Sequence, residues 1–587
     1  MHDREVSDDI YYSFNDNPND KDSSKIFLEI ENFSKPVINK IKKTEKKEDY
    51  LEQTIFPVEQ DFLVKVNKIE QKSPFDDLNN YEKETLWRNR FAAAKIDSLI
   101  PKLFLSYDNN SPTINNDLEK IIHKITNLSV VQAIELLSGK YVNEIIRNFA
   151  VDCLRVVNPV NIQAYLLQLV QALKYEKNHD NSLARFLLEE AIEHPLTIGH
   201  ELFWHLRSEM SNQDVQQRFG LYLEVFLSKI SRPLFRIFKD EDNLLKSLIT
   251  IAEKIKTIKN TEERDRIFRE DINIIDGYLK INKKEVSLPL NFKMRTKGII
   301  AEKCRIMKSK KKPLWLTFEN ADPLGSDIVV MLKCGDDLRM DMVTLQLFKA
   351  MHTLWFENKL NVKMSLYKVL CTGNQEGMLE MVTNAETLAY IHVKEGGALS
   401  QFFSKGSIKN WIDKNCRPKN EAIDNFLISN VAYCLATFVL GIGDRHNDNI
   451  MIKKNGELFH IDFGHFLGHF KYKMGIKRER APFVFTRQFQ SVLGGDDSEK
   501  FIEFKQKLKK GYLILRNNKE VIITLLSILL CTGIPELNEK SLRFLEKSLF
   551  LKKSDKEAEE YLDKKLLDSL DSVSTKLNFA IHIVANK

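Results

Sequence analysis

The chain has 587 residues, of which 43% are hydrophobic and 29% are charged, and its formal net charge at neutral pH is +6. A chain of this length exceeds what one hydrophobic core can hold, so several domains are expected. The small positive charge does not indicate nucleic-acid binding, and the seven cysteines contain no CxxC pair, which favours reduced cytosolic thiols over a zinc or disulfide framework.

The N-terminal region has little capacity to form a core. Residues 1–25 are polar and acidic, which predicts a disordered tail. Residues 26–75 contain one alternating segment, KIFLEIENFSKPV, and then charged residues, which predicts a single β-strand and a linker. One strand is not stable alone, so it pairs with the rest of the protein unless the chain has lost its partner strands. We expect no secretory signal and no membrane span, because the longest apolar run, 521–534, is shorter than the roughly 20 residues that a span needs.

Residues 76–284 follow the helical period. Ile162, Leu166, Leu169 and Leu173, for example, recur at intervals of three or four residues and form one apolar stripe. Short helices joined by short breaks predict stacked helix pairs, which is an α-solenoid. On this pattern alone, the region would serve as a scaffold.

Residues 285–587 change texture and predict a two-lobed domain with a cleft between the lobes. In the smaller lobe, 285–382, we expect four strands and one helix. The strands are KPLWLTFENA, DIVVMLKCG, KMSLYKVL and GMLEMVT, and the helix is DDLRMDMVTLQLFKAMHTLWFEN. The larger lobe, 383–587, is mainly helical.

One stretch of the larger lobe, GIGDRHNDNIMIKKNGELFHIDFGHF at 441–466, concentrates acids, amides and imidazoles. An apolar helix ends before Gly441, so DRHNDN is a loop, and the residues after it form a hairpin around the turn KKNG. The hairpin returns Asn449 and Asp462 to the same end, where an amide oxygen and a carboxylate suit Mg²⁺. His446 lies beside them and is suited to accept a hydroxyl proton.

The order D-R-H-x-x-N, twelve further residues and then D-F-G resembles the catalytic and magnesium-binding loops of the phosphoinositide 3-kinase family. The resemblance extends over about 76–587 through KKKPLWLTFENAD, KCGDDLRMD, KRERAPFVFT, QRFGLYLEVF and FWHLRSEM. It implies an α+β multidomain protein in which an α-solenoid helical (PIK) domain precedes a protein-kinase-like lipid kinase domain that uses ATP and Mg²⁺.

The resemblance also implies roles for individual residues. The catalytic candidates are His446, Asp444 and His465, and the metal ligands are Asn449 and Asp462. Lys333 contacts the nucleotide phosphates, Ser309 and Lys311 belong to the phosphate loop, and Arg445 braces the catalytic loop. The remaining nucleotide-binding residues are the polar Asp341 and Tyr367, the hinge residues Glu380 and Val382, and the apolar walls Met307, Trp315, Met331, Met451 and Ile461.

The segment between DFG and APF is strongly basic, and its cations are Lys471, Lys473, Lys477, Arg478 and Arg480. Such charge matches a doubly phosphorylated inositol head, and KRERAPF resembles the class I members of the family, which implies 3-phosphorylation of phosphatidylinositol 4,5-bisphosphate. The alternatives are a class III-type phosphatidylinositol 3-kinase, a protein kinase of the related giant Ser/Thr family, and an inactive kinase-like scaffold. We expect a cytoplasmic protein recruited peripherally to membranes, the plasma membrane foremost. The adaptor-binding and Ras-binding domains of class I relatives are not visible in the sequence, so a regulatory subunit is left open.

Overall fold

The computed structural model describes residues 62–571 except 109–110, 401–405, 471, 474–475, 478–480 and 531. The expected disordered tail and the strand at 26–38 lie outside the described residues. Within the expected linker, residues Phe62–Glu70 form helix α2, so the prediction of a linker up to residue 75 is wrong for this part. Phe62, Val66 and Ile69 recur at helical spacing, and all three are buried.

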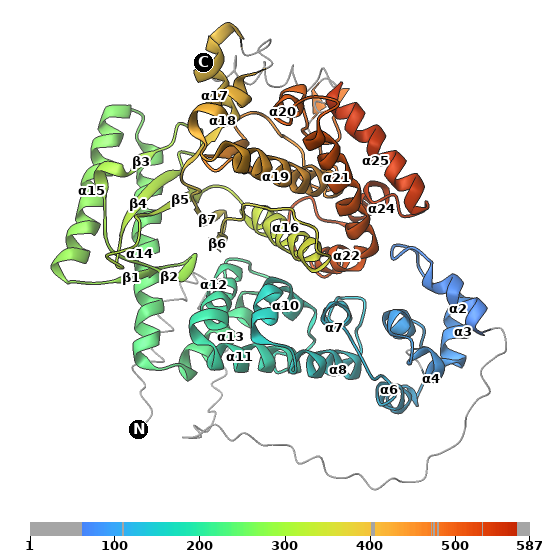
Figure 1. The fold of residues 1–587 in the computed structure, drawn as a ribbon. Coiled ribbons are helices and arrows are strands. Elements are labelled where there is room, and N and C mark those ends of the chain that lie inside the picture. The colour runs from blue at the N-terminus through green and yellow to red at the C-terminus, as the bar shows by residue number, and fades with distance from the viewer. Residues whose placement is uncertain are drawn as a thin grey trace, which may run out of the picture.

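The helical region predicted from the sequence is confirmed as a stack of short helices. Their bounds are α3 (Asn80–Arg88), α4 (Arg90–Ala93), η1 (Asp97–Leu99), α5 (Ile100–Leu103), α6 (Ile114–Ile122), α7 (Val130–Leu136), α8 (Glu144–Leu154), α9 (Pro159–Ala164), α10 (Leu166–Ala172), η2 (Leu173–Tyr175), α11 (Ser182–Glu193), η3 (Pro195–Gly199), α12 (His200–Glu209) and α13 (Gln216–Lys229). Several begin at a side chain that accepts a backbone N–H, such as Ser129 before α7 and Asn181 before α11. In Figure 1 this region, in blue and cyan, lies along one side of both lobes of the domain that follows.

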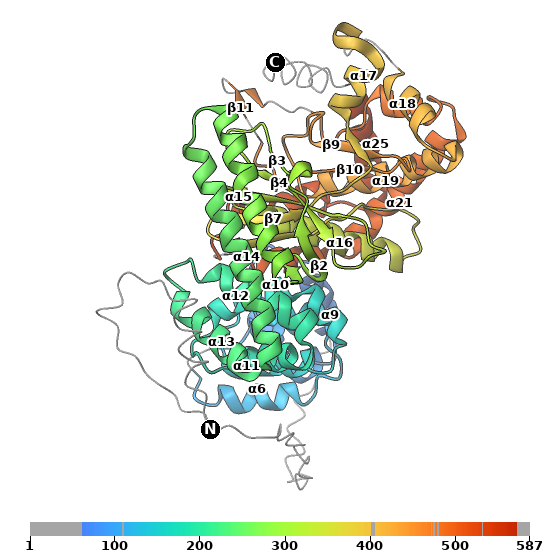
Figure 2. The same ribbon diagram turned by 90° about the vertical axis from the view of Figure 1, so that its left-hand side faces the viewer.

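The last two helices of the expected helical domain have a different role. α14 (Arg232–Thr257) and α15 (Thr261–Ile281) pack on each other and on the strands of the smaller lobe, as both views show (Figures 1 and 2). Asp276 of α15 accepts the backbone N–H of Ile299 at 2.9 Å. α14 and α15 are therefore helices, as expected, but they pack with the small lobe.

The small lobe contains a seven-stranded antiparallel sheet with the order β1-β2-β4-β5-β7-β6, in which β3 also pairs with β4. The strands are β1 (Val286–Leu288), β2 (Asn291–Ile299), β3 (Arg305–Ile306), β4 (Leu314–Asn320), β5 (Ile328–Cys334), β6 (Val369–Gly373) and β7 (Glu376–Glu380), with the short helix η4 (Ala301–Lys303) after β2. The prediction of a strand from Lys363 is wrong for 363–368, because Lys363 and Ser365 instead reach across to Glu457 of the larger lobe.

Helix α16 (Arg339–Glu357) connects the parts of the protein. It lies between the sheet and the helices of the larger lobe, where Trp355 donates to the carbonyl of Gly511 at 3.0 Å. Gln346 of the same helix donates to the carbonyl of Ala164 in the helical domain at 3.0 Å. The three parts therefore share one continuous core.

The larger lobe is mainly helical, as predicted. Its helices are α17 (Leu388–Ser400), α18 (Ser407–Asn415), α19 (Lys419–Val439), α20 (Arg487–Val492), α21 (Glu499–Asn517), α22 (Lys519–Ser527), α23 (Glu539–Leu542), α24 (Phe544–Ser548) and α25 (Asp555–Leu570). Its strands are β8 (Ala385–Thr387), β9 (Ile450–Lys453) and β10 (Leu458–His460), which form one sheet, and the hairpin β11 (Tyr472–Lys473) and β12 (Ile476–Lys477). Among the described residues, α19 is long and apolar enough to span a bilayer, but 78% of its most apolar stretch is buried within the protein. This burial makes α19 the central helix of the lobe.

Candidate active site

The two polar loops predicted to form the site lie side by side. α19 ends at Val439, and Gly441 follows with φ of +55°, where an added Cβ would come within 2.5 Å of the Phe544 ring. The β9–β10 hairpin forms around the KKNG turn as predicted, and Ile461 donates its backbone N–H to the carbonyl of Asn449 at 3.0 Å. Gly443 donates its N–H to the carbonyl of His465 at 3.1 Å, which joins the DRH loop to the DFG loop.

Arg445 holds the two loops together from within. Its guanidinium is buried and donates to the carbonyls of Gly443 at 2.8 Å, Ile461 at 2.7 Å and Asp462. The same group lies over the ring of Phe463, 5.4 Å from its centroid. The predicted bracing role of Arg445 is therefore confirmed by its contacts.

Asn449 and Asp462 have the geometry of a site for a hard cation. The amide nitrogen of Asn449 donates to the carbonyl of Asp444 at 2.9 Å, which orients the amide with its oxygen as the remaining acceptor. Asp462 has φ of +60° and a half-exposed carboxylate at the end of the hairpin. Among the described residues, no group of three or more His, Cys, Asp or Glu side chains could hold a metal ion. This pair suits Mg²⁺, which takes one or two protein oxygens and completes its shell with phosphate oxygens and water.

The three catalytic candidates gather around this pair. Asp444 also lies in the left-handed region, with φ of +59°, which a short acidic side chain tolerates. The Nδ1 atom of His446 accepts the backbone N–H of Asp448 at 3.3 Å. The Nδ1 atom of His465 faces a carboxylate instead, that of Glu536 at 2.8 Å. Both imidazoles therefore turn Nδ1 toward a protein partner, but this atom accepts a backbone N–H in His446 and faces a carboxylate in His465.

His460 has a structural role, although it belongs to the same polar cluster. It is buried and stacked on Tyr433, with ring centroids 5.1 Å apart. Burial, together with the nearby charge of Arg445, lowers the pKa of His460 well below its usual value, so the ring stays neutral.

Lys333 of β5 and Asp341 of α16 contact this loop pair from the side of the small lobe. The ammonium of Lys333 on β5 is 3.8 Å from the carboxylate of Asp462. Asp341, on the first turn of α16, is buried and accepts the backbone N–H of Phe463 at 3.0 Å. Burial raises the pKa of Asp341 to about 6, although the positive charge of Lys333 opposes the shift.

Tyr367 completes the polar back of the predicted nucleotide pocket. It is buried, and burial together with the charges of Asp341 and Asp462 raises the pKa of its phenol well above the usual value. Glu380 ends β7 opposite Val330 and accepts the N–H of Lys368 at 3.1 Å. Val382 follows two residues later, in the segment that leads into the larger lobe.

The five predicted apolar walls share one property, since each is only partly buried. Trp315 pairs with Met331 across β4 and β5, and Lys333 lies two residues further along β5 on the same face. Met451 lies on β9, and Ile461 follows β10. Met307 precedes the phosphate loop, and the guanidinium of Arg305 covers the face of Trp315 at 4.3 Å. The nucleotide-binding roles of these residues remain predictions.

In the phosphate loop, the structure gives Lys311 a protein partner. Its ammonium pairs with the carboxylate of Asp336, just before α16. Ser309 accepts the backbone N–H of Lys311 at 3.4 Å, which keeps the turn compact.

The predicted lipid-binding cations are described only in part. Lys471, Arg478 and Arg480 lie outside the described residues. Lys473 and Lys477 lie on the two strands of the β11–β12 hairpin, where Lys473 pairs with Ile476 and Tyr472 with Lys477. Their backbones are therefore close together at one hairpin.

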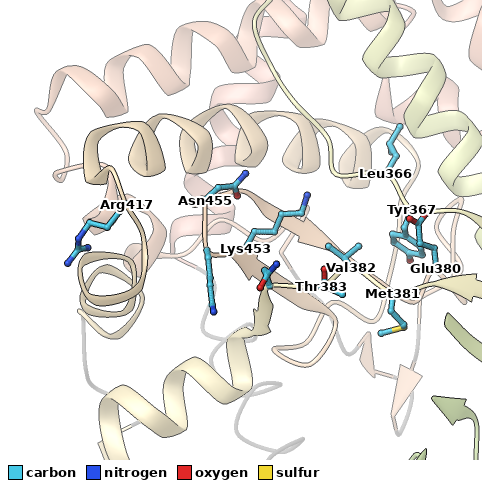
Figure 3. Close-up of a pocket in the computed structure, with 11 residues that line it drawn as sticks. Leu366, Tyr367, Glu380, Met381, Val382, Thr383, Arg417, Lys453 and Asn455 are labelled. Carbon is cyan, nitrogen blue, oxygen red and sulfur yellow. The ribbon is translucent and has the colours of Figure 1, made fainter. Parts of the chain in front are cut away.

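A cavity of about 610 Å³ lies against the hinge (Figure 3). Tyr367, Glu380 and Val382 line it, as do Arg417 and Lys453 of the larger lobe. The cavity therefore includes three of the predicted nucleotide-binding residues, but none of the five predicted apolar walls lines it.

The sequence analysis missed two acidic residues that contact the site. Glu536 pairs with His465, and Asp336 pairs with Lys311. Asp336 belongs to the segment KCGDDLRMD, which lies close to the phosphate loop through this pair. Glu536 lies 71 residues from His465 and carries no local signal.

Comparison with known proteins agrees with this geometry. Residues 327–539 match the family model described as phosphatidylinositol 3- and 4-kinase, and 56–239 match the accessory (PIK) domain of the phosphoinositide 3-kinase family. The chain is 37% identical over 593 residues to phosphatidylinositol 3-kinase 1 of Dictyostelium discoideum, covering 97% of this chain and 36% of that protein.

Two further relatives give similar figures. Phosphatidylinositol 3-kinase 2 of Dictyostelium discoideum is 38% identical, over 87% of this chain and 27% of that protein. The human phosphatidylinositol 4-phosphate 3-kinase C2 domain-containing subunit beta is 34% identical, over 89% of this chain and 32% of that protein. The chain thus spans about a third of the length of these relatives. It carries the helical accessory domain and the kinase domain of the phosphoinositide 3-kinase family.

Proposed function

We propose that the protein transfers the terminal phosphoryl group of ATP to the 3-hydroxyl of phosphoinositides, with phosphatidylinositol 4,5-bisphosphate as the preferred substrate. The observation that carries the proposal is the approach of Lys333 from the small lobe to Asp462 of the larger lobe, beside Asn449. The lysine ammonium suits direct contact with the phosphates of a nucleotide, and the two oxygen ligands suit the Mg²⁺ that accompanies the β- and γ-phosphates.

Phosphoryl transfer requires positioning and charge neutralisation more than covalent chemistry. Asn449 and Asp462 would hold Mg²⁺, which neutralises phosphate charge when bound. Lys333 binds the phosphates, and Arg445 keeps both loops in register. His446 and His465 are the candidates for accepting the proton of the lipid hydroxyl, and Asp444 orients the loop between them.

The substrate preference rests on the basic segment after DFG. Each cation near an anionic membrane contributes about 1 kcal/mol, and a bisphosphate head offers more negative charge than phosphatidylinositol does. Lys473 and Lys477 lie on the two strands of the hairpin in this segment.

A second substrate, phosphatidylinositol 4-phosphate, is favoured by the name of the human relative. One phosphomonoester fewer would need fewer cations at the same hairpin. The remaining alternatives are a class III-type phosphatidylinositol 3-kinase, a protein kinase and an inactive scaffold.

We further propose a cytoplasmic protein that acts at membrane surfaces, the plasma membrane foremost. A regulatory subunit is left open.

The test is transfer of radiolabel from ATP to vesicles that contain phosphatidylinositol, its 4-phosphate or its 4,5-bisphosphate, with Mg²⁺ supplied. We expect the label at the 3-position, most of it on the bisphosphate. Label on the 4-phosphate alone would favour the second substrate, and label on phosphatidylinositol alone the class III alternative. Label on protein alone would indicate a protein kinase, and no transfer to any acceptor would indicate the scaffold.

A further inference from the structure

Glu536 binds the DFG loop at two points. Its Oε1 atom lies 2.8 Å from Nδ1 of His465, and its Oε2 atom accepts the backbone N–H of Phe466 at 3.3 Å. One carboxylate therefore fixes both the imidazole ring and the backbone beside it.

This contact decides which nitrogen of His465 carries a proton. An ionised carboxylate only accepts hydrogen bonds, so Nδ1 must be the donor. In the neutral ring, the lone pair then belongs to Nε2. Loss of Glu536 would remove this restraint on the tautomer and the orientation of the ring.

The backbone of Glu536 also indicates that its position is imposed. Its φ is +63°, in the left-handed region that a long side chain rarely adopts. Such a conformation persists only where the surroundings determine it, and it is often found at functional sites.

The surroundings of Glu536 include the helical domain. The hydroxyl of Tyr175 donates to the carbonyls of Ile528, at 3.0 Å, and Leu530. The ammonium of Lys174 donates to the carbonyl of Thr532 at 3.2 Å and pairs with Glu209 at 2.8 Å. The end of η2 therefore holds the chain that leads from α22 to Glu536.

We propose that Glu536 is a positioning residue for His465, and that Tyr175 and Lys174 of the helical domain hold the segment that carries it. The inference rests on the proposed phosphoryl transfer, in which His465 lies near the transferred group. It gives the helical domain a direct effect on the arrangement of the catalytic loops.

The first test compares Glu536→Ala with Glu539→Ala in the full chain. Glu539 is exposed and lies three residues away, and its replacement by alanine removes the same charge. We expect Glu536→Ala to lower kcat at least about tenfold, with little change in the KM for ATP, because ring orientation affects the transfer step. Glu536→Gln should recover part of kcat, since the amide oxygen still accepts from Nδ1. Wild-type kcat in Glu536→Ala, an equal loss in Glu539→Ala, or no recovery in Glu536→Gln would overturn the inference.

A spectroscopic test does not require activity. In protein labelled with ¹⁵N-histidine, His465→Ala identifies the signals of His465. We expect these signals to report a protonated Nδ1 in the wild type and an altered tautomer in Glu536→Ala. Unaltered signals would overturn the positioning role. If the wild type phosphorylates no lipid, the proposed function fails, and this comparison still decides the contact.

The second test concerns the helical domain. Tyr175→Phe removes only the hydroxyl that holds the carbonyls of 528 and 530, so we expect kcat to fall about two- to fivefold in the same direction as in Glu536→Ala. Tyr222→Phe is the matched control, because that hydroxyl bonds to His179 within the helical domain. An effect on kcat no larger in Tyr175→Phe than in Tyr222→Phe would contradict the coupling.

Discussion

The ammonium of Lys333 lies 3.8 Å from the carboxylate of Asp462, and this approach joins β5 of the small lobe to the DFG loop of the larger lobe. Asp341 reinforces the same junction by accepting the backbone N–H of Phe463. The ring of Phe463 packs edge-on against that of Phe348 of α16, with the two ring centroids 5.1 Å apart. These contacts therefore join the two lobes beside the proposed Mg²⁺ ligands.

Lys333→Met tests the nucleotide side of this junction. Methionine keeps most of the length and removes the charge, so we expect the KM for ATP to rise about tenfold and turnover to fall about 100-fold. The measurement is steady-state lipid kinase kinetics over a range of ATP concentrations. Lys349→Met, at an exposed position on α16, is the control and should leave both constants unchanged. An unaltered KM and turnover in Lys333→Met would show that this lysine does not bind the nucleotide.

Arg445→Lys tests how the two loops are held. A lysine cannot reach the three carbonyls that the guanidinium contacts, so buried acceptors lose their partners. We expect the free energy of unfolding to fall by about 2–3 kcal/mol and turnover to fall with it. Denaturant unfolding and kinetics measure the two effects, and Arg487→Lys on the surface is the control. Full stability in Arg445→Lys would contradict the bracing role.

Glu457 gives a prediction about pH. Burial alone would raise the pKa of Glu457, but hydrogen bonds from Lys363, Ser365 and Lys453 outweigh it and lower the pKa to about 2. Because the folded-state pKa is lowered, the carboxylate stabilises the fold above about pH 4.5, and this contribution is lost as the pH falls toward 2.

Glu457→Gln should therefore reduce stability at pH 7 by about 2 kcal/mol, a figure lowered for solvent screening because Lys363 is half exposed. The deficit should shrink by pH 3.5. Thermal unfolding at both pH values measures it, with Glu560→Gln at an exposed position as the control. A deficit of equal size at both pH values would mean that the ion pairs do not cause it.

The basic segment is tested by the double variant Lys477→Ala and Arg478→Ala. Loss of two cations should abolish use of the 4,5-bisphosphate and spare phosphatidylinositol, since the second lipid needs no ring-phosphate contact. Lys540→Ala, at an exposed position on α23, is the control. Equal loss on both lipids would mean that the segment supports catalysis in general and does not select the headgroup.

The parts of the site that could be predicted are those that local spacing determines. The KKNG turn alone returns Asn449 and Asp462 to one end of a hairpin, and strand alternation puts Met331 and Lys333 on one face. Contacts between distant segments could not be predicted in this way. Nothing near His465 indicates its pairing with Glu536, which depends on where α22 ends and on what holds that end.

The same reason explains the corrections to the fold. Residues 363–368 alternate like a strand, but their side chains bond to Glu457 of the other lobe, and β6 begins only at Val369. The periodicity of α14 and α15 predicts helices correctly, but it contains no information about the surface on which they pack.

The most direct test of the account is lipid phosphorylation by Asp462→Asn beside the wild type, with Asp497→Asn at an exposed position as the control. The account predicts 3-phosphorylation by the wild type and the control, and a loss of at least about 100-fold in Asp462→Asn with the fold retained. Wild-type turnover in Asp462→Asn would contradict the proposal that this carboxylate and Asn449 form the centre of the site.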